Sequence, residues 1–327
     1  MTKMKTITAT VDRWHPDPLK VSKAARVLMA GGLVAFPTET VYGLGADALN
    51  PEAVAKIYEA KGRPSDNPLI LHVYSIVQAM HLVEMNDTAE KLALKFWPGP
   101  LTLVLPAKSC VPSITRGGLD TAAVRMPANK VAEALIYASG CPVAAPSANL
   151  SGRPSPTDAD SVLQDMDGRI DFILDGGSTT GGIESTVIDM TNPERPLMLR
   201  PGGMPREDIE EVLGCRLELP DTLSTKRSPG THYRHYSPDI PVIIWRKGEK
   251  FPDVFPAGYM GIDDPESDGV TNKIVFTSYE DYAHGLFAGF RKFEAGGVAC
   301  IVVQWPEDDS GINEGLRDRI SRAAGLG

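Results

Sequence analysis

The sequence predicts an α/β protein with two domains, and three observations support this. Its 327 residues are 42% hydrophobic and 23% charged, as in ordinary globular proteins, and this length suits two domains of ~150 residues. Segments with helical and with strand periodicity alternate along the chain, which favours an α/β architecture. Between residues 220 and 239 the chain becomes polar and aperiodic, as linkers are. We expect a first domain over residues 15–205, a linker over 206–239 and a second domain over 240–327.

The chain is expected to begin with a strand, a helix and a second strand. Residues 6–11 resemble a short strand. Over residues 18–31 apolar residues recur at helical spacing until the pair Gly31-Gly32, which is typical of a helix end. The apolar run 33–36 predicts a buried strand that leads into the turn Pro37-Thr38-Glu39-Thr40. Turns at strand ends commonly carry binding residues.

The alternation continues through the first domain. Proline and glycine end two of the expected helices, at Lys61-Gly62-Arg63-Pro64 and Trp97-Pro98-Gly99-Pro100. We expect further helices over residues 52–60, 88–96, 129–139 and 158–165. We expect further strands over residues 69–73, 101–105, 122–125, 143–145, 170–174 and 186–189.

The second domain is expected to be a small α/β unit. Strands are predicted over residues 240–245 and 297–303, and helices over 279–295 and 313–324. No Gly-x-Gly-x-x-Gly fingerprint occurs in it. We therefore expect this domain to control opening, closure or partner contact without contributing chemistry.

The charge distribution argues against a protein that grips nucleic acid. The formal net charge is −9 and the sequence pI is near 5.2. Residues 1–200 carry 19 basic and 21 acidic residues, whereas residues 201–327 carry 14 and 21. Neither part has the strong positive charge that binding through phosphate contacts requires. We expect no strong direct nucleic-acid binding, although a local cationic cleft is compatible with these totals.

The cysteines and apolar runs indicate a cytoplasmic protein. Cys110, Cys141, Cys215 and Cys300 match no zinc or Cys-x-x-Cys spacing, so we interpret them as small hydrophobic residues in a reducing compartment. The N-terminus has no apolar signal core, and no run approaches the ~18 apolar residues of a membrane span.

Two cations flank a glycine in Lys61-Gly62-Arg63-Pro64. A helix C-terminus attracts cations, so Lys61 and Arg63 could simply complement the helix dipole. Alternatively, Gly62 and Pro64 hold two cationic side chains next to each other, as polyphosphate binding requires. The residues alone support both interpretations.

Two loops carry small polar side chains. Residues 145–152 follow an apolar strand, and their hydroxyl and amide groups suit either a ligand or a turn. Residues 176–182 are rich in glycine, but Ile183 follows where a phosphate loop would continue with Lys and Ser or Thr. A Walker A loop is therefore excluded, and a bound nucleotide must be held by other means.

The linker contains an unusual group of side chains at residues 232–236. A His-x-x-His pair can bind a metal, but two tyrosines and an arginine surround it here. We interpret Tyr233, Arg234, His235 and Tyr236 as parts of a lid over a site.

The expected site is cationic and has no obvious nucleophile. The chain has no Gly-x-Ser-x-Gly elbow, and no cysteine lies in a recognisable catalytic context. Lys61, Arg63, Arg125 and Arg200 each lie at the edge of a predicted strand or turn. Several cations that converge could hold a small, highly charged anion.

Six motifs occur in a fixed order between residues 20 and 240. They are residues 37–45, 61–64, 147–149, 184–186, 200–202 and 228–238. Together they resemble the YrdC-like family, in particular its two-domain threonylcarbamoyl-AMP synthases. The resemblance implies an open, twisted mixed sheet with a concave cationic face, followed by a small Rossmann-like α/β domain and joined to it by a linker that crosses the active-site mouth.

The resemblance also implies an activity. Such nucleotidyltransferases join L-threonine, bicarbonate and ATP into threonylcarbamoyl-AMP and release pyrophosphate, with Mg²⁺ on the ATP phosphates and no metal held directly by the protein. The product serves threonylcarbamoyl modification of the tRNA adenosine next to the anticodon, and partner transferase proteins carry out the transfer. Positioning and charge neutralisation would supply most of the catalysis.

The resemblance further implies the roles of individual residues. Lys61 and Arg63 would be the catalytic residues, through electrostatic positioning. ATP would be bound by Lys61, Arg63, Asn67, Thr121, Ser147, Asn149, Ser155, Arg200 and His235. Threonine or its carbamate would be bound by Thr40, His72, Arg125, Ala145 and Ser185.

Two other functions are compatible with parts of the pattern. A double-stranded RNA-binding or ribosome-maturation module could share the concave surface, but the charge of residues 1–200 and the linker motif count against it. A carbamoyl-transfer enzyme of the hydrogenase-maturation type would normally add a zinc-finger region, and no matching Cys pattern occurs.

Overall fold

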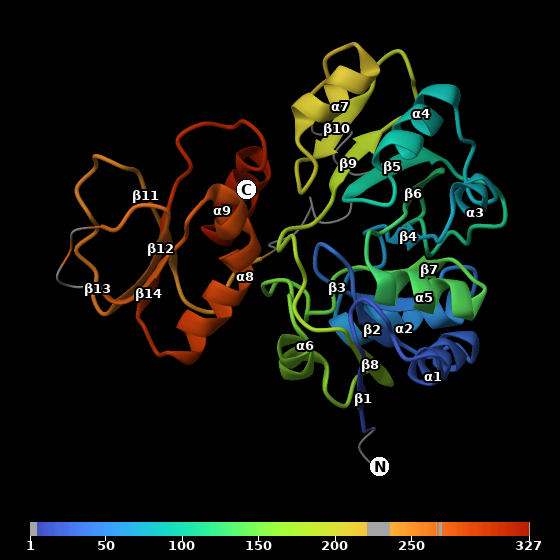
Figure 1. The fold of residues 1–327 in the computed structure, drawn as a ribbon, viewed down its shortest axis with the longest axis horizontal. Coiled ribbons are helices and arrows are strands. Elements are labelled where there is room, and N and C mark those ends of the chain that lie inside the picture. Colours follow the sequence, from blue (N-terminus) through green and yellow to red (C-terminus); the bar gives the residue numbers. More distant parts are fainter. Residues whose placement is uncertain (1–4, 221–235, 266, 268–269, 327) are drawn as a thin grey trace.

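Two sheets organise the protein, each in a domain of its own (Figure 1). The computed structural model describes residues 5–220, 236–265, 267 and 270–326. Tyr233, Arg234 and His235, three of the expected lid residues, therefore lie outside the described residues. Within the described part of the chain, no helix is long and apolar enough to cross a membrane.

The first domain contains a ten-stranded mixed sheet. In spatial order its strands are β1 (Ile7–Thr10), β8 (Phe172–Asp175), β2 (Val34–Pro37), β3 (Tyr42–Asp47), β7 (Val143–Ala144), β4 (Ile70–His72), β6 (Thr121–Arg125), β5 (Leu101–Pro106), β9 (Thr186–Asp189) and β10 (Leu197–Arg200). The β1–β8, β2–β8, β4–β6 and β5–β9 pairs are parallel, and the other pairs are antiparallel. The predicted mixed sheet is confirmed.

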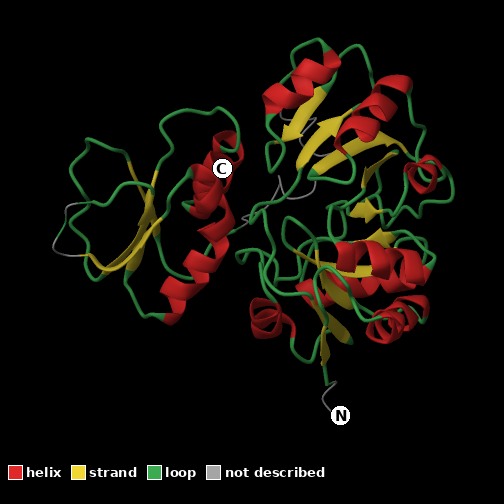
Figure 2. Ribbon diagram, in the orientation of Figure 1, coloured by secondary structure: helices red, strands yellow, loops and turns green. Residues whose placement is uncertain are grey.

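Helices cover both faces of this sheet (Figure 2). They are α1 (Pro18–Met29), α2 (Pro51–Lys61), α3 (Ile76–Met80), α4 (Asp87–Phe96), α5 (Lys130–Ser139), α6 (Ala159–Met166) and α7 (Arg206–Leu213). Side chains of Asn50, Asn86 and Asn129 accept hydrogen bonds from first-turn N–H groups and so begin α2, α4 and α5. The left-handed Gly62 and Gly140 end α2 and α5.

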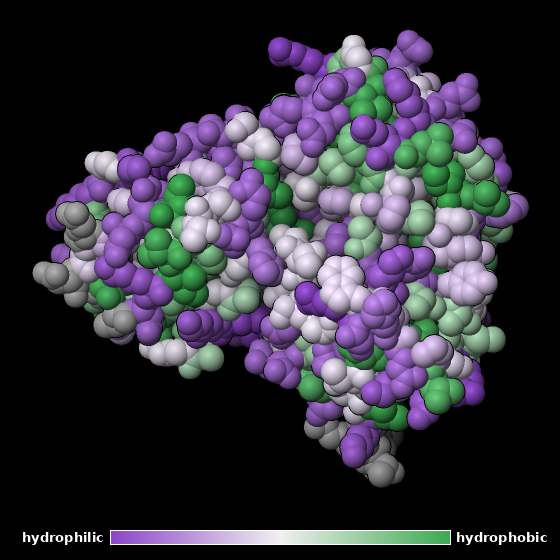
Figure 3. Space-filling view, viewed as in Figure 1, coloured by the Kyte–Doolittle hydropathy of each residue, from purple (hydrophilic) through white to green (hydrophobic). Residues whose placement is uncertain are grey.

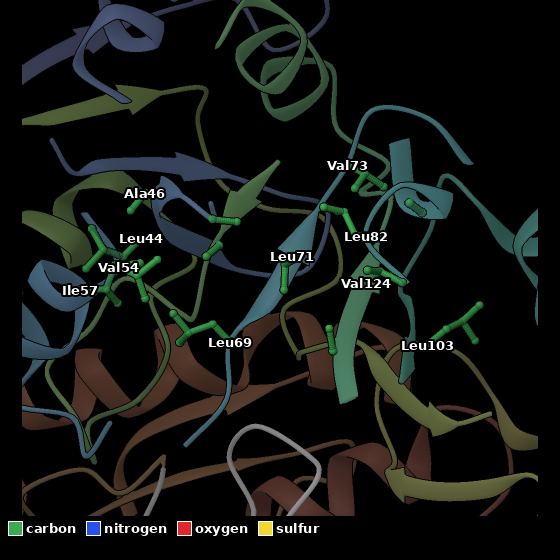
Figure 4. Close-up of a cluster of buried hydrophobic side chains, with 14 of the residues drawn as sticks. Leu44, Ala46, Val54, Ile57, Leu69, Leu71, Val73, Leu82, Leu103 and Val124 are labelled. Atoms are coloured by element: carbon green, nitrogen blue, oxygen red, sulfur yellow. The ribbon is translucent and has the colours of Figure 1, made fainter. Parts of the chain in front are cut away.

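Strand alternation separates the core into two layers. In β2, Val34 and Phe36 pack with α1 and α5, whereas Ala35 faces the opposite layer. That larger layer contains Leu71 and Val124, which are register partners in β4 and β6 (Figure 4). The buried apolar surface on both faces fixes the strand register, because a slip of one residue would exchange the faces.

The second domain has a four-stranded parallel sheet, in agreement with the predicted small α/β unit. Its order is β11 (Val242–Trp245), β14 (Cys300–Gln304), β12 (Ala257–Gly261) and β13 (Val270–Val275). The helices α8 (Tyr279–Ala295) and α9 (Asn313–Ala323) lie between this sheet and the first domain (Figure 1).

Several elements were not predicted. They are β3, α3, β10, α7, β12 and β13. The helix α7 lies inside the segment 206–239 that the sequence analysis assigned to the linker, yet its Ile209 is fully buried in the core of the first domain. The ordered chain of the first domain therefore continues past the expected boundary at residue 205.

The two domains are in close contact. Val41 and Ile183 of the first domain pack into the apolar core of the second. Arg291 of α8 forms a 2.8 Å ion pair with Asp165 of α6, and both side chains are buried. Figure 3 shows the domains in contact, with hydrophilic residues over most of this face and hydrophobic ones in separate patches. The apolar contacts hold the second domain against the first.

Candidate active site

A cavity lies where strand ends of the first domain meet residues from the interdomain region. Its wall contains ten of the residues that the sequence analysis placed in the site or its lid: Thr40, Arg63, His72, Arg125, Ala145, Ser147, Asn149, Ser185, Arg200 and Tyr236. Lys61, Asn67, Thr121 and Ser155 are not in the wall. Among the described residues, the cavity thus brings together motifs that are far apart in the sequence.

Two parallel strands position one side of the cavity. His72 ends β4 and Arg125 ends β6, and the two residues are register partners. Neighbouring parallel strands end at the same sheet edge, so these side chains lie together although 53 positions separate them in the chain. Thr40 reaches the same place from the turn after β2.

Arg125 is buried and held by three first-domain groups. Its Nη1 donates to Thr40 Oγ1 at 3.1 Å and its Nε donates to the carbonyl of Gly99 at 3.2 Å. Its Nη2 lies 2.6 Å from Glu39 Oε2, an ion pair without hydrogen-bond alignment. Glu39 lies in the motif at residues 37–45, but no role was predicted for it. A carboxylate ligand at Arg125 would meet this existing negative charge.

His72 lies beside Arg125 as a neutral imidazole. Its side chain is buried, Nδ1 is 3.2 Å from the carbonyl oxygen of Ile70, and its ring meets Phe36 edge-on. Burial, reinforced by the nearby charge of Arg125, lowers the pKa of His72 to about 3. His72 is therefore uncharged near neutral pH and acts there as a hydrogen-bonding group.

Lys61 ends α2 and fastens the loop after β7. Its buried Nζ donates to the carbonyl oxygens of Ser147 and Asn149, both at 2.5 Å. These bonds use two of the three ammonium protons. Burial and the neighbouring Arg63 hold the pKa of Lys61 well below its usual range. Lys61 thus shapes the loop that lines the cavity, instead of lining the cavity itself.

Arg63 follows the left-handed Gly62 and extends into the cavity wall. Its Nη2 donates to the carbonyl of Pro68 at 3.3 Å, and its Nε has no hydrogen-bond partner among the described residues. Burial lowers the pKa of Arg63 to about 10, so it stays cationic at neutral pH. The left-handed Gly62 thus separates the roles of the two side chains: Arg63 lines the cavity, whereas Lys61 holds the loop behind it.

Two buried amides near these cations have unpaired polar atoms among the described residues. Both polar atoms of Asn67, a residue only 1% exposed, lack a hydrogen-bond partner. Asn149 donates through Nδ2 to the carbonyls of Leu150 and Arg153, but its Oδ1 has no partner. Buried polar groups are nearly always satisfied, so these atoms are suited to a ligand.

Another part of the wall is built by Ser185, which precedes β9, and Arg200, which ends β10. Arg200 Nη2 donates to the carbonyl of Ser185 at 2.8 Å, and Ser185 Oγ lies 2.8 Å from Thr102 Oγ1. Ser155 is behind the wall, where its hydroxyl donates to Glu184 Oε1 at 2.5 Å. Glu184 itself lines the cavity, and its acidic side chain was not among the predicted site residues.

Tyr236 is the described residue of the predicted lid that reaches the cavity. It has a φ of 63°, its ring is stacked on Phe287 of α8 at 5.4 Å, and the guanidinium of Arg319 lies 5.2 Å from its ring centre. Burial raises the pKa of its hydroxyl. The end of the linker is thus packed between the cavity and the second domain.

Thr121, a predicted site residue, lies outside the cavity wall. It begins β6, at the opposite end of the strand from Arg125, and pairs in register with Pro106. A strand rises ~3.3 Å per residue, so Thr121 and Arg125 are separated by most of the strand length. Among the described residues, no group of three or more His, Cys, Asp and Glu side chains could hold a metal ion.

Comparisons with known proteins agree with this architecture. A family model described as "Telomere recombination" matches residues 26–202, and one described as "Threonylcarbamoyl-AMP synthase, C-terminal domain" matches residues 204–325. The threonylcarbamoyl-AMP synthase of Pyrococcus abyssi is 43% identical, over 99% of this chain and 98% of that protein. That of Bacillus subtilis is also 43% identical, over 94% of both chains.

Solved structures show the same two-domain fold. The crystal structure of P. abyssi Sua5 complexed with L-threonine has a TM-score of 0.89 and 41% identity, and the match covers 98% of each chain. The structure of E. coli YciO, at 24% identity and a TM-score of 0.55, matches 61% of this chain and 96% of its own, and shares the fold over that part only. With both domains matched by family models and by full-length relatives, the chain belongs to the two-domain threonylcarbamoyl-AMP synthase family.

Proposed function

We propose that this protein makes threonylcarbamoyl-AMP and pyrophosphate from L-threonine, bicarbonate and ATP. It is an enzyme of the AMP-transferring kind, as its relatives over nearly the whole chain are. The observation that carries the substrate assignment is the cavity, whose wall brings Arg63, Arg125 and Arg200 together. Such a wall suits two anionic substrates bound next to each other.

The reaction has two steps, the formation of a carbamate and its adenylation. The amine of threonine attacks the carbon of bicarbonate and water leaves, which gives a carbamate. A carbamate oxygen then attacks the α-phosphorus of ATP, and the bond to the β-phosphate oxygen breaks to release pyrophosphate. Both steps crowd negative charges together, so cations fixed in a buried wall would lower the barrier by positioning and neutralisation.

The two sides of the cavity suggest where each substrate binds. The side with Thr40, His72 and Arg125 offers a hydroxyl, a neutral imidazole and a guanidinium, which suit an amino acid and its carbamate. The amino acid named in the complex of P. abyssi Sua5 is L-threonine, which supports threonine as the amino acid that this cavity binds. A threonine carboxylate at Arg125 would have to share that cation with Glu39 or displace it.

The other side suits the nucleotide. Arg63, Arg200 and the loop of Ser147 and Asn149 would hold the triphosphate, and the unpaired amide of Asn67 lies behind them. Mg²⁺, when bound, would neutralise phosphate charge. The described residues offer no carboxylate cluster for it, so the ATP phosphates would be its main ligands, with Asn149 Oδ1 an available protein oxygen.

The product would serve threonylcarbamoyl modification of the tRNA adenosine next to the anticodon. Downstream transferase proteins would use the activated threonylcarbamoyl group, so this enzyme would need no strong direct grip on tRNA. The net charge of −9 is consistent with that division of labour, and a cytoplasmic location is part of the same proposal.

The test is pyrophosphate release with single omissions. The protein is incubated with ATP, Mg²⁺, bicarbonate and L-threonine, and then with each component left out in turn. We expect release only in the complete mixture, and with L-serine a much lower rate. Release that continues without threonine or without bicarbonate would contradict the proposal. Tight, strongly salt-dependent tRNA binding without ATP turnover would favour an RNA-binding module instead.

A further inference from the structure

Arg319 connects the second domain to the wall of the cavity. It lies on α9, and its side chain is fully buried. Nε donates to Glu184 Oε2 at 2.6 Å, and Nη1 donates to the carbonyl of Pro201 at 3.1 Å and to Asp318 Oδ2 at 2.5 Å. A buried guanidinium from one domain thus pairs with a carboxylate that lines the site of the other.

Glu184 also lies near cations of the cavity. It shares the cavity wall with Arg63 and Arg200, and burial alone would raise its pKa. The charges of Arg319 first and Arg200 second outweigh burial, so the pKa of Glu184 is lowered and it is a carboxylate at neutral pH. Both of its oxygens accept a hydrogen bond, Oε1 from the Ser155 hydroxyl and Oε2 from Arg319 Nε.

Without Arg319, the buried negative charge of Glu184 would weaken the positive charge of the cavity wall. A buried carboxylate that loses its partner is strongly unfavourable, so its charge acts on the next nearest cation. For Glu184 that cation would be Arg200, which the proposed function assigns to the triphosphate. An ATP molecule would then have to displace a carboxylate, and it would be repelled by it.

We propose that Arg319 is a positioning residue of the nucleotide site: it engages Glu184, so that the cavity keeps its positive charge only when the second domain is docked. This inference rests on the proposed function, because it takes ATP as the anion. It differs from the expectation that the second domain contributes nothing to the chemistry of the site. Arg319 touches no substrate and acts through Glu184 and through the ring of Tyr236.

Three variants of the full-length protein test the charge relation. Arg319→Gln should weaken ATP binding by about tenfold or more, because Glu184 is left without its partner. Glu184→Gln should bind ATP as tightly as the wild type or more tightly, because a negative charge leaves the wall. The double variant Glu184→Gln/Arg319→Gln should recover most of the affinity that Arg319→Gln loses. Calorimetric titration with ATP, with Mg²⁺ present, gives all four dissociation constants, the wild-type value included.

A matched control separates charge from docking. Arg291 is also a buried arginine of the second domain, and it pairs across the interface with Asp165 and the carbonyl of Pro154. It does not line the cavity. Arg291→Gln should lower the thermal stability of the interface much as Arg319→Gln does, but its loss of ATP affinity should be several-fold smaller.

The outcomes are distinct. A loss of ATP affinity in Arg319→Gln, no loss in Glu184→Gln and recovery in the double variant support the inference. Equal losses in Arg319→Gln, Glu184→Gln and Arg291→Gln, with no recovery in the double variant, would overturn it and reduce Arg319 to a docking contact. If Arg319→Gln does not fold, the sign of the Glu184→Gln effect and the double variant still decide. A wild-type protein that binds no ATP would refute the proposed function itself.

Discussion

Lys61, at the end of α2, donates hydrogen bonds to the loop of Ser147 and Asn149. It thus holds a loop of the cavity in place although its own side chain is not in the wall. Lys61→Met should leave the carbonyls of Ser147 and Asn149 without their donor and let the loop move. We expect turnover to fall on the order of 10²-fold, since small displacements of positioning groups have effects of that size.

Lys56 provides a control on the same helix. Its Nζ also donates to a backbone carbonyl, that of Gly31 at 2.6 Å, away from the cavity. Lys56→Met should cost similar stability and leave the rate of pyrophosphate release within about twofold of the wild type. Equal rates for Lys61→Met and Lys56→Met would mean that the loop does not depend on Lys61.

His72 makes a prediction about pH. Its pKa is lowered to about 3 in the folded protein, so the unfolded chain binds a proton at higher pH than the folded one does. Stability should therefore fall as the pH drops from the unfolded value of ~6.5 towards 3, by up to about 1.4 kcal/mol per pH unit from this group. Urea unfolding at several pH values should show a shallower fall for His72→Gln.

An exposed histidine serves as the comparison. His81 lies on the surface after α3, so His81→Gln should keep the wild-type pH dependence. An unchanged slope in His72→Gln would show that the buried imidazole is not responsible for the loss of stability in acid.

The sequence identified many single residues of the site but not their partners. Motif residues such as Arg63, Ser147 and Arg200 line one cavity, as their family resemblance implied. Glu39, Glu184 and Arg319 gained their roles only from the structure. Their partners come from distant positions, as in the pair Glu184–Arg319 at a separation of 135 residues, and helical periodicity does not mark such pairs.

At the scale of elements, strong periodicity was the reliable signal. The helix over residues 279–295 and the strand over 186–189 have the predicted bounds, because their apolar residues follow one period throughout. The strand β3 was missed, since Gly43 and Gly45 give it low strand propensity. A Cβ on Gly45 would lie 2.7 Å from a side-chain atom of Val143 and 2.8 Å from one of Phe36, so close packing explains this glycine.

The contact between α7 and α9 predicts a second pH effect. Glu314 of α9 lies 3.2 Å from Arg206 of α7. Burial first, and then the charges of Asp309, Glu207 and Glu210, outweigh Arg206 and raise the pKa of Glu314 to about 7. A raised carboxyl pKa stabilises the folded protein below its unfolded value of ~4.5, and this contribution is lost as the pH rises through 7.

Melting temperatures between pH 5 and pH 8 test this contact. Over this range the wild type should lose stability relative to Glu314→Gln, which has no carboxyl to ionise, because the opposite contribution of His72 below pH 6.5 is the same in both proteins. Glu280→Gln, at an exposed position of α8, should behave like the wild type. A wild-type slope in Glu314→Gln would mean that this carboxyl titrates normally.

At the scale of the whole molecule, Gly182 determines how closely the domains approach. Its φ is +79°, and a Cβ there would lie 2.3 Å from His284 Cα and 2.4 Å from the carbonyl oxygen of Ala283, both in α8. Gly182→Ala should push the second domain away and raise the KM for ATP by about tenfold, since docking completes the cavity around Tyr236. Small-angle scattering should show a larger radius of gyration.

A substitution at Gly177 is a control for the backbone strain that Gly182→Ala introduces besides its clash with α8. Its φ of +80° matches that of Gly182, but a Cβ there would meet only the end of the flexible Arg13 side chain at 3.4 Å. Gly177→Ala should therefore carry the same strain and keep wild-type kinetics. If both variants raise the KM equally, the approach of α8 is not what the site requires.

The two-domain α/β architecture was predictable because composition changes near residue 220 and helices and strands alternate on both sides of it, although six elements were missed. The docking of the domains was not, since it depends on the burial of Val41, Ile183 and Arg319 in surfaces that the sequence does not pair. The excess negative charge lies after residue 200, and the first domain keeps the arginines of the cavity.

The proposed function requires that the protein joins L-threonine, bicarbonate and ATP into threonylcarbamoyl-AMP. Reaction with ¹³C-labelled bicarbonate, ATP and L-threonine, followed by mass spectrometry of the isolated adenylate, tests it directly. We expect an adenylate that contains threonine and the labelled carbon, formed together with an equal amount of pyrophosphate. An adenylate of threonine without the label, or pyrophosphate formed without any labelled adenylate, would contradict it.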